Sequence, residues 1–332
     1  MSAWLRKLWG ALAIAVFSVG AQASVGYREI ALPGTTMGVW YPSDEPAQVR
    51  KLGPFELNYA FDGAPRAGQW PLIVFSHGVN GRYRNHYLSL QALAQAGFVV
   101  AAPQHTGDKD IRTHDFQAAF ASRVSELAHA VAAVRDDPVL GAVTRTDVVH
   151  GLGYSLGGAT VLAAAGAVVD EGLVKSHCRQ NAAEDLDFCS DTPMMGLLHQ
   201  FKRLFSQTAR EDTLKAKTAP MTINGAVALV APIGQGLIMD PTRMGAQRIL
   251  DVAVQGDVIA PPRFHADVIA QALPGITTLV RRSGHHYAFI SPIPKWALGK
   301  DDYFIINDPE GFDRLAFIDS INQTLVPFFS QP

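Results

Sequence analysis

The chain has 332 residues, of which 48% are hydrophobic and 17% are charged. These values are typical of a folded globular protein and exclude collagen-like and disordered chains. With a formal net charge of −2, the chain has no excess of basic residues with which to bind phosphates, so nucleic acid is not expected as a partner.

Residues 1–23 have the pattern of a secretory signal peptide. Two basic residues precede an apolar run over residues 8–20, and Ala-Gln-Ala at 21–23 supplies the small-x-small cleavage pattern. The run is shorter than the ~20 apolar residues of a membrane-spanning helix, and no cysteine follows that could carry a lipid. We therefore expect bacterial export to the periplasm or the medium, a mature chain of residues 24–332, and no stable membrane anchor after cleavage.

Short apolar runs bounded by turn residues predict strands. Two such runs, 27–32 and 37–41, open the mature chain. The later runs are continuous and apolar, which is typical of strands that are covered on both faces of a parallel sheet. These later runs are 71–76, 98–102, 147–153, 226–231, 249–254 and 277–280.

Apolar residues at helical spacing predict helices between these strands. The first predicted helix begins at residue 87 and ends before Gly97. The other three cover residues 116–135, 157–169 and 312–329. This alternation predicts an α/β fold with right-handed crossovers and a mostly parallel sheet. The pattern lapses over residues 170–219, where we expect a helical insertion over the sheet edge, within a single domain.

The two cysteines, Cys178 and Cys189, both lie in this insertion. In an oxidising compartment we expect them to form a local disulfide rather than to act as reactive thiols. They also lack the paired spacing of zinc ligands, so no metal site is expected.

A nucleophile motif follows the predicted strand 147–153. Gly-Tyr-Ser-Leu-Gly at residues 153–157 fits G-x-S-x-G, and it lies between a strand and a helix, as the motif requires. Small residues on both sides let the backbone turn sharply and present Ser155. A dinucleotide fingerprint is excluded because it would need glycine in place of Leu156. A glycine-rich turn with an incidental serine is the remaining alternative.

Attack by Ser155 would create an oxyanion that needs N–H donors. In proteins with a G-x-S-x-G turn between a strand and a helix, one donor is the N–H of the residue after the nucleophile, here Leu156. The other donor lies in a loop after an early strand. Ser-His-Gly-Val at residues 76–79 is that loop, so we expect the second donor to be the N–H of Val79. We expect a structural role for the side chain of His77.

The order Ser, Asp, His along the chain narrows the search for the acid. Asp257 comes just after the predicted strand 249–254, at the carboxyl end where α/β sites assemble. Asp251 is a weaker candidate because it lies within that strand. Asp240, further upstream, is the main competitor.

Two adjacent histidines, His285 and His286, follow the last predicted strand. A neutral imidazole in this loop can accept the proton of the serine hydroxyl while a carboxylate holds its other nitrogen. The motif leaves open which histidine is the base. A shared metal ion is disfavoured because adjacent residues rarely converge on one ion and H-E-x-x-H is absent.

Several of these motifs resemble those of serine esterases of the α/β-hydrolase fold, especially the bacterial predicted dienelactone-hydrolase and platelet-activating-factor acetylhydrolase-like group. They are Val-Trp-Tyr-Pro-Ser at 39–43, Phe-Ser-His-Gly at 75–78 and the elbow at 153–158. The resemblance covers most of residues 38–329. It implies the α/β-hydrolase fold and serine esterase activity.

The resemblance differs between branches of the group. The acetylhydrolases carry their acid on the strand after the elbow, where this chain has apolar residues 227–231. Asp-Val-Ile-Ala-Pro at 257–261 is instead similar to the acid turn of dienelactone hydrolases and cutinase-like polyester hydrolases. The run at 286–292 is similar to H-[FY]-x-F-[LI]-x-P, which favours His286 over His285. Dienelactone hydrolases proper use a cysteine nucleophile, so serine here argues against dienelactone as substrate.

We therefore expect an exported serine hydrolase that cleaves small-molecule carboxylic esters with Ser155, His286 and Asp257 and without a metal or organic cofactor. A peptidase or acyltransferase could use the same acyl-enzyme, and a non-catalytic binding protein could share the fold. Both remain alternatives.

Overall fold

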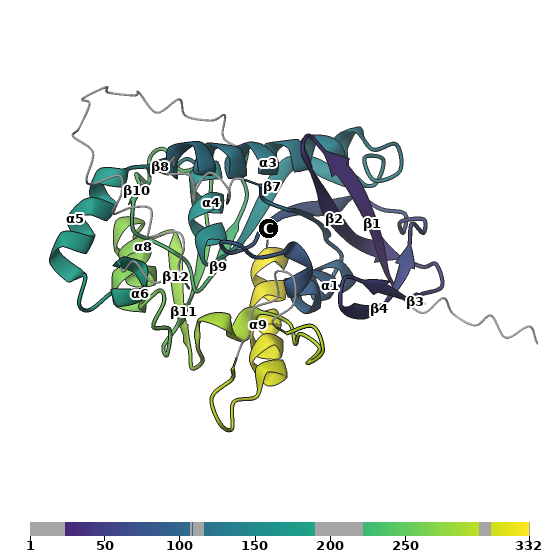
Figure 1. The fold of residues 1–332 in the computed structure, drawn as a ribbon. Helices are drawn as coiled ribbons and strands as arrows, with labels where there is room; N and C mark the ends of the chain where they lie inside the picture. Colours follow the sequence, from purple (N-terminus) through teal and green to yellow (C-terminus); the bar gives the residue numbers. More distant parts are fainter. Residues whose placement is uncertain (1–23, 107, 109–115, 190–221, 299–306, 332) are drawn as a thin grey trace, which may run out of the picture.

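The computed structural model of the protein describes residues 24–106, 108, 116–189, 222–298 and 307–331 (Figure 1). The predicted signal peptide and the part of the predicted insertion from residue 190 to residue 219 lie outside these residues. Within the described part of the chain, no helix has both the length and the hydropathy of a bilayer-spanning segment.

Ten strands of the described residues form one mixed sheet, in the order β12-β11-β9-β7-β5-β6-β2-β1-β4-β3. The strands from β12 to β6 all pair in parallel, whereas β2 pairs antiparallel with both β6 and β1. The predicted α/β class with a mostly parallel sheet is confirmed. The strands are Ser24–Leu32 (β1), Thr35–Ser43 (β2), Gln48–Leu52 (β3), Phe55–Phe61 (β4), Trp70–Ser76 (β5), Val99–Pro103 (β6), Thr144–Tyr154 (β7), Val227–Val230 (β9), Ile249–Val254 (β11) and Thr277–Arg282 (β12).

Helices cover both faces of this sheet (Figure 1). Alternate side chains of β5 join different cores: Leu72 and Val74 pack in the cluster that contains α3, α4 and α8, and Ile73 and Phe75 pack in the cluster that contains α1 and α9. Because both faces are buried, the central strands are continuous apolar runs. The helices are Tyr87–Gln95 (α1), Phe116–Asp136 (α3), Leu156–Ala164 (α4), Ala266–Ala272 (α8) and Arg314–Ser330 (α9).

The helix after the elbow is shorter than predicted. The apolar pattern predicts a helix over 157–169, but α4 ends at Ala164. Gly166 follows with a positive φ of 118°, a backbone conformation that favours glycine and ends helices. The N–H of Ala167 bonds back to the carbonyl of Leu162, and Val168–Val169 (β8) then pairs with Leu237–Ile238 (β10).

The edge of the sheet formed by β3 and β4 is not predicted by the sequence pattern. Four of the five residues of β3 are exposed, so this strand lacks the apolar run or alternation that predicts strands. Its Arg50 and Lys51 are typical of edge strands, where charged side chains discourage pairing with other chains.

The described part of the insertion is helical, as predicted, with α5 (Glu171–Asn181) and α6 (Leu186–Cys189). The predicted disulfide is confirmed, since Cys178 of α5 is bonded to Cys189 of α6. The bond therefore fastens the short α6 to the longer α5.

Replacing both cysteines with serine is expected to lower the free energy of unfolding by about 2–3 kcal/mol, because the bond closes a short loop that the unfolded chain would otherwise leave open. Urea denaturation of the wild type and of the Cys178→Ser/Cys189→Ser variant measures this difference. As a control, dithiothreitol should destabilise the wild type and leave the variant unchanged. Equal unfolding midpoints for the two oxidised proteins would contradict the expectation.

Candidate active site

Ser155 occupies the sharp turn between β7 and α4. Its backbone angles, φ 54° and ψ −123°, lie outside the regions that L-residues favour, so the surrounding packing must hold them. Both glycines of the motif are needed for this packing. A Cβ on Gly157 would lie 1.9 Å from the carbonyl oxygen of Ser76, and one on Gly153 would lie 2.4 Å from the carbonyl oxygen of Gly157.

A chain of hydrogen bonds joins Ser155, His286 and Asp257. The Oγ of Ser155 lies 2.9 Å from Nε2 of His286, and Nδ1 of His286 lies 2.6 Å from Oδ2 of Asp257. All three residues are at least 95% buried. An ionised carboxylate only accepts hydrogen bonds, so with Asp257 ionised Nδ1 carries the proton of a neutral imidazole and Nε2 is free to accept the hydroxyl proton of Ser155.

The turn after β11 aims the carboxylate of Asp257. Its Oδ1 accepts hydrogen bonds from the N–H groups of Ile259, at 2.9 Å, and Ala260, at 2.7 Å. These bonds leave Oδ2 for His286. The acid is therefore held by its own turn, independently of the histidine that it orients.

The loop that carries His286 is held from two sides. The hydroxyl of Tyr154, the residue before Ser155, donates to the carbonyl of His286 at 3.0 Å. The guanidinium of Arg314, at the start of α9, donates to the carbonyls of Tyr287 and, at 2.8 Å, Ile290. Neither Tyr154 nor Arg314 was identified in this role from the sequence, because the bonds link residues far apart in the chain.

The adjacent His285 points to a different carboxylate. Its Nε2 lies 2.8 Å from Oδ1 of Asp308, which is also paired with Arg314. The structure therefore brings His286 to Ser155 and places His285 at the partly exposed edge of the loop.

The two alternative acids lie elsewhere. Asp240 is a partly exposed turn residue whose Oδ1 accepts hydrogen bonds from the N–H and the hydroxyl of Thr242. Asp251 is fully buried within β11, and no described residue donates a hydrogen bond to either of its carboxylate oxygens. Among the described residues, no histidine is bonded to either of them.

Burial raises the pKa of Asp251 well above its ordinary value. The folded state then holds a proton that the unfolded state releases above a pH of about 3.9, so wild-type stability falls as the pH rises toward the folded pKa. Asp251→Asn removes this titration. Its free energy of unfolding, relative to wild type, is expected to rise by up to about 1.4 kcal/mol per pH unit in this range. Urea denaturation from pH 4 to 8 measures the difference.

Asp240→Asn is the matched control, with the opposite sign. The hydroxyl and then the N–H of Thr242 lower the pKa of Asp240, so its contribution to stability is present above the unfolded pKa and is lost in acid. This variant should therefore lose stability relative to wild type only as the pH rises through the acid range to about 5, and its difference from wild type should be level from there to pH 8. A pH-independent difference for Asp251→Asn would show that Asp251 does not titrate differently in the folded chain.

Both predicted oxyanion donors belong to segments next to Ser155. Leu156 is the first residue of α4, and the first N–H groups of a helix have no acceptor within it. Gly78 packs against Ser155, since a Cβ on it would lie 3.3 Å from Cβ of that serine. Among the described residues, none accepts a hydrogen bond from the N–H of the following residue, Val79.

The side chain of His77 has the structural role expected of it. Its Nδ1 donates to the carbonyl of Gly78 at 2.7 Å, and its Nε2 accepts from the N–H of His105 at 3.1 Å. Burial, and then the nearby His105 and Arg123, hold the pKa of His77 well below its ordinary value. The neutral ring therefore fixes the loop.

A buried polar cluster behind this loop is not predicted by the sequence. Ser76 Oγ lies 2.8 Å from Nε2 of His105, whose Nδ1 lies 2.7 Å from Glu126. The arrangement is similar to a catalytic triad, but the side chain of Ser76 is fully buried. The only signal in the sequence is a pair of charges, Arg123 and Glu126, three positions apart on an alanine-rich helix.

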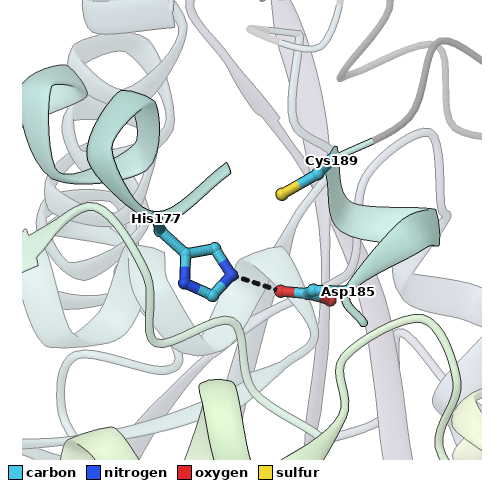
Figure 2. A group of neighbouring side chains, drawn as sticks. All are labelled: His177, Asp185 and Cys189. Atoms are coloured by element: carbon cyan, nitrogen blue, oxygen red, sulfur yellow. Dashed lines mark hydrogen bonds and ion pairs between the residues drawn. The ribbon is translucent and has the colours of Figure 1, made fainter. Parts of the chain in front are cut away.

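A second cluster has residue types that bind metals. Figure 2 shows His177 of α5 facing Asp185, with Cys189 of α6 beside them, and their ligand atoms lie within 4.8 Å of one another. However, the sulfur of Cys189 is bonded to Cys178, so it is not a thiolate and cannot supply the ligand that a metal would need there.

The same cluster instead attaches the insertion to the start of α8. Asp185 lies 2.7 Å from Nε2 of His177 and 3.3 Å from Nε2 of His265. Nδ1 of His265 accepts from the N–H of Gly234, so its proton is on Nε2 and faces the carboxylate. Burial opposes ionisation of Asp185, but the hydrogen bond from His177 and the nearby imidazole of His265 lower its pKa overall.

Comparison with known proteins gives one family match. The family described as platelet-activating factor acetylhydrolase, isoform II, matches residues 51–136, a segment that includes β5, the loop with Val79, and α3. No curated protein matches the chain. The family match and the helix-flanked sheet agree with the predicted fold and family resemblance, and acetylhydrolases are esterase-type hydrolases. The match ends before Ser155.

Proposed function

We propose that this chain, which has the α/β-hydrolase fold and is related to the platelet-activating factor acetylhydrolases, is an exported serine hydrolase that cleaves small-molecule carboxylic esters. The observation that supports this most directly is the continuous hydrogen-bond chain from Ser155 through His286 to Asp257. A buried serine in a strained turn, bonded to a neutral imidazole that a carboxylate holds, is the arrangement that nucleophilic acyl transfer needs.

In the first half of the proposed reaction, Oγ of Ser155 attacks the ester carbonyl while Nε2 of His286 takes its proton. The carbonyl oxygen becomes an oxyanion, which the N–H groups of Leu156 and Val79 stabilise. Asp257 keeps the imidazole oriented and stabilises the imidazolium. The tetrahedral intermediate then breaks its bond to the alcohol oxygen, which receives the proton from His286, and the acyl group remains on Ser155.

In the second half, water repeats these steps. His286 takes a proton from the water as it attacks the acyl carbon, and the same N–H groups hold the second oxyanion. Return of the proton to Oγ of Ser155 releases the carboxylic acid and regenerates the enzyme. Each step uses only groups of this chain, so the proposed mechanism involves no cofactor.

The proposed location outside the cytoplasm rests on the predicted signal peptide and on the disulfide between Cys178 and Cys189. Disulfides form and persist in oxidising compartments and are rare in the bacterial cytoplasm. The proposal is therefore a periplasmic or secreted enzyme.

Labelling with an organophosphonate tests the nucleophile without assuming a substrate. The purified mature chain is expected to bind one equivalent, and peptide mapping should place it on Ser155, because among the described residues only this hydroxyl is bonded to the His286 imidazole. The Ser155→Ala variant is the control and should remain unlabelled. A wild-type chain that stays unlabelled would support the non-catalytic alternative.

A panel of esters, amides and lactones separates the proposed activity from the peptidase and acyltransferase alternatives. Hydrolysis of p-nitrophenyl esters without cleavage of matched anilides is expected. Preferential transfer of the acyl group to added alcohol, or faster cleavage of the anilides, would overturn the assignment as an ester hydrolase.

A further inference from the structure

A buried guanidinium lies between the two segments that carry the proposed oxyanion donors. Arg123 of α3 has no solvent exposure. Burial of a cation is unfavourable unless acceptors surround it, and removal of one partner from a buried charged network is strongly destabilising. The acceptors that Arg123 has found therefore indicate which parts of the protein it holds in place.

The first set of acceptors holds the loop with Val79. Nη2 of Arg123 donates to the carbonyl of His77, and Nη1 donates to Oδ1 of Asp108 at 2.6 Å. The other oxygen of Asp108 accepts the N–H of Asn80 at 2.7 Å. The peptide between Gly78 and Val79, which carries the proposed donor, thus lies between two peptides that the Asp108–Arg123 ion pair fixes.

The remaining donor of the guanidinium reaches the segment that follows the nucleophile. Nε of Arg123 donates to Oγ1 of Thr160 at 3.0 Å, and this hydroxyl donates to the carbonyl of Leu156 at 3.0 Å. Leu156 carries the other proposed donor. One side chain is therefore bonded, directly or through a single residue, to both halves of the proposed oxyanion hole.

We propose that Arg123 is a positioning residue that sets the spacing between the N–H groups of Val79 and Leu156. The inference rests on the proposed function and adds to it a residue that touches neither substrate nor triad. The guanidinium is suited to this role because its planar fork presents donors in fixed directions. A lysine ammonium in the same place keeps the charge but is a point donor on a flexible stem, so it cannot span the same four acceptors, which include Oγ of Ser76 at 3.4 Å from Nη2.

Arg123→Lys, made in the full exported chain, tests the proposal. Oxyanion donors act mainly in the transition state, so kcat for a p-nitrophenyl ester should fall roughly 10²–10³-fold while KM changes little. The acid limb of the pH–rate profile should keep its position, because the His286–Asp257 pair is not altered. A boronic acid, which forms a tetrahedral adduct with the serine, should bind more weakly by a similar factor.

Arg28→Lys is the matched control. Arg28 is a partly buried arginine of β1 that pairs with Asp137, outside the site, so this variant makes the same chemical change without touching the loop. Its kcat should equal that of wild type. All values of kcat are expressed per Ser155 that organophosphonate labels at completion, so that a smaller folded fraction does not count as lost activity.

Thr160→Val is the second variant and keeps the test decisive if Arg123→Lys does not fold. It is nearly isosteric and removes only the link between Arg123 and Leu156, so a smaller loss of kcat, on the order of 10-fold, is expected, again without a change in KM. If the folded variants keep the wild-type kcat per labelled site while Ser155→Ala is inactive, the role of Arg123 is overturned and the proposed function still stands. A wild-type chain that is neither labelled nor active would overturn the proposed function and this inference together.

Discussion

Replacing Ser155 with alanine is expected to lower kcat for a short p-nitrophenyl ester by roughly 10⁶-fold, to the level that binding and oxyanion stabilisation alone provide. The hydroxyl is the only group that can form the acyl-enzyme in the proposed mechanism. The fold should persist, because the lost side-chain atom is bonded to His286 and not to the backbone of the elbow. Steady-state kinetics and thermal unfolding of the same preparations measure the two effects.

Ser283→Ala is the matched control for this prediction. Ser283 lies in the loop just before the two histidines, is exposed, and makes only a 3.5 Å contact with Gln255. Its loss should leave kcat within about twofold of wild type, as for ordinary surface substitutions. Substantial turnover by Ser155→Ala, in a preparation free of contaminating esterase, would rule out Ser155 as the nucleophile.

Replacing His286 with alanine is expected to lower kcat by a similar factor, because the nucleophile and its base act as a unit. His285→Ala should retain kcat within a few-fold of wild type, because its imidazole pairs with Asp308 and not with the serine. The two variants make the same substitution at adjacent residues, so a difference in kcat on the same ester shows which of the two imidazoles is needed. Added imidazole should partly restore activity to His286→Ala, since a diffusible base can enter the space left by the side chain.

The opposite ranking, with His285→Ala the more damaged variant, would assign the base to the other histidine. Equal losses would indicate that the loop as a whole, rather than one imidazole, determines activity. Circular dichroism spectra that match the wild type are required of both variants. Arg314 still holds the loop through Tyr287 and Ile290 in either case.

The elbow could be predicted from the sequence because its geometry is local. Gly153, Ser155 and Gly157 are close in the chain, and their spacing follows from the tight turn that they form. The central strands could also be predicted from the sequence, because a strand buried on both faces must be apolar throughout. The order of residues along the chain then pointed to Asp257, which lies just after such a strand.

The choice between the histidines could not be made from local pattern. His285 and His286 both have a carboxylate partner in the structure, Asp308 for one and Asp257 for the other. Two adjacent residues point in different directions, and which direction faces the serine depends on how β11 and β12 pair with the rest of the sheet. Only the resemblance to a known motif favoured His286.

The hydrogen bonds of Arg123 could not be predicted from the sequence. The residues that Arg123 itself bonds lie 15 to 47 positions away in the chain, and a charge on a helix is usually solvated. Nothing in the helical pattern distinguishes a buried guanidinium from an exposed one. The disulfide, in contrast, could be predicted because the compartment and the count of cysteines decide it.

Each residue of the Ser-His-Asp chain follows a strand: Ser155 follows β7, Asp257 follows β11 and His286 follows β12. The last two of these strands lie near the C-terminal end of the chain. A ribosome has therefore synthesised the nucleophile well before the base and the acid exist. In the proposed mechanism an incomplete or unfolded chain should be chemically inert, since its serine has no imidazole beside it. Hydrolytic power would thus arise only after docking of the final strands, and it would vanish together with the sheet during cooperative denaturation.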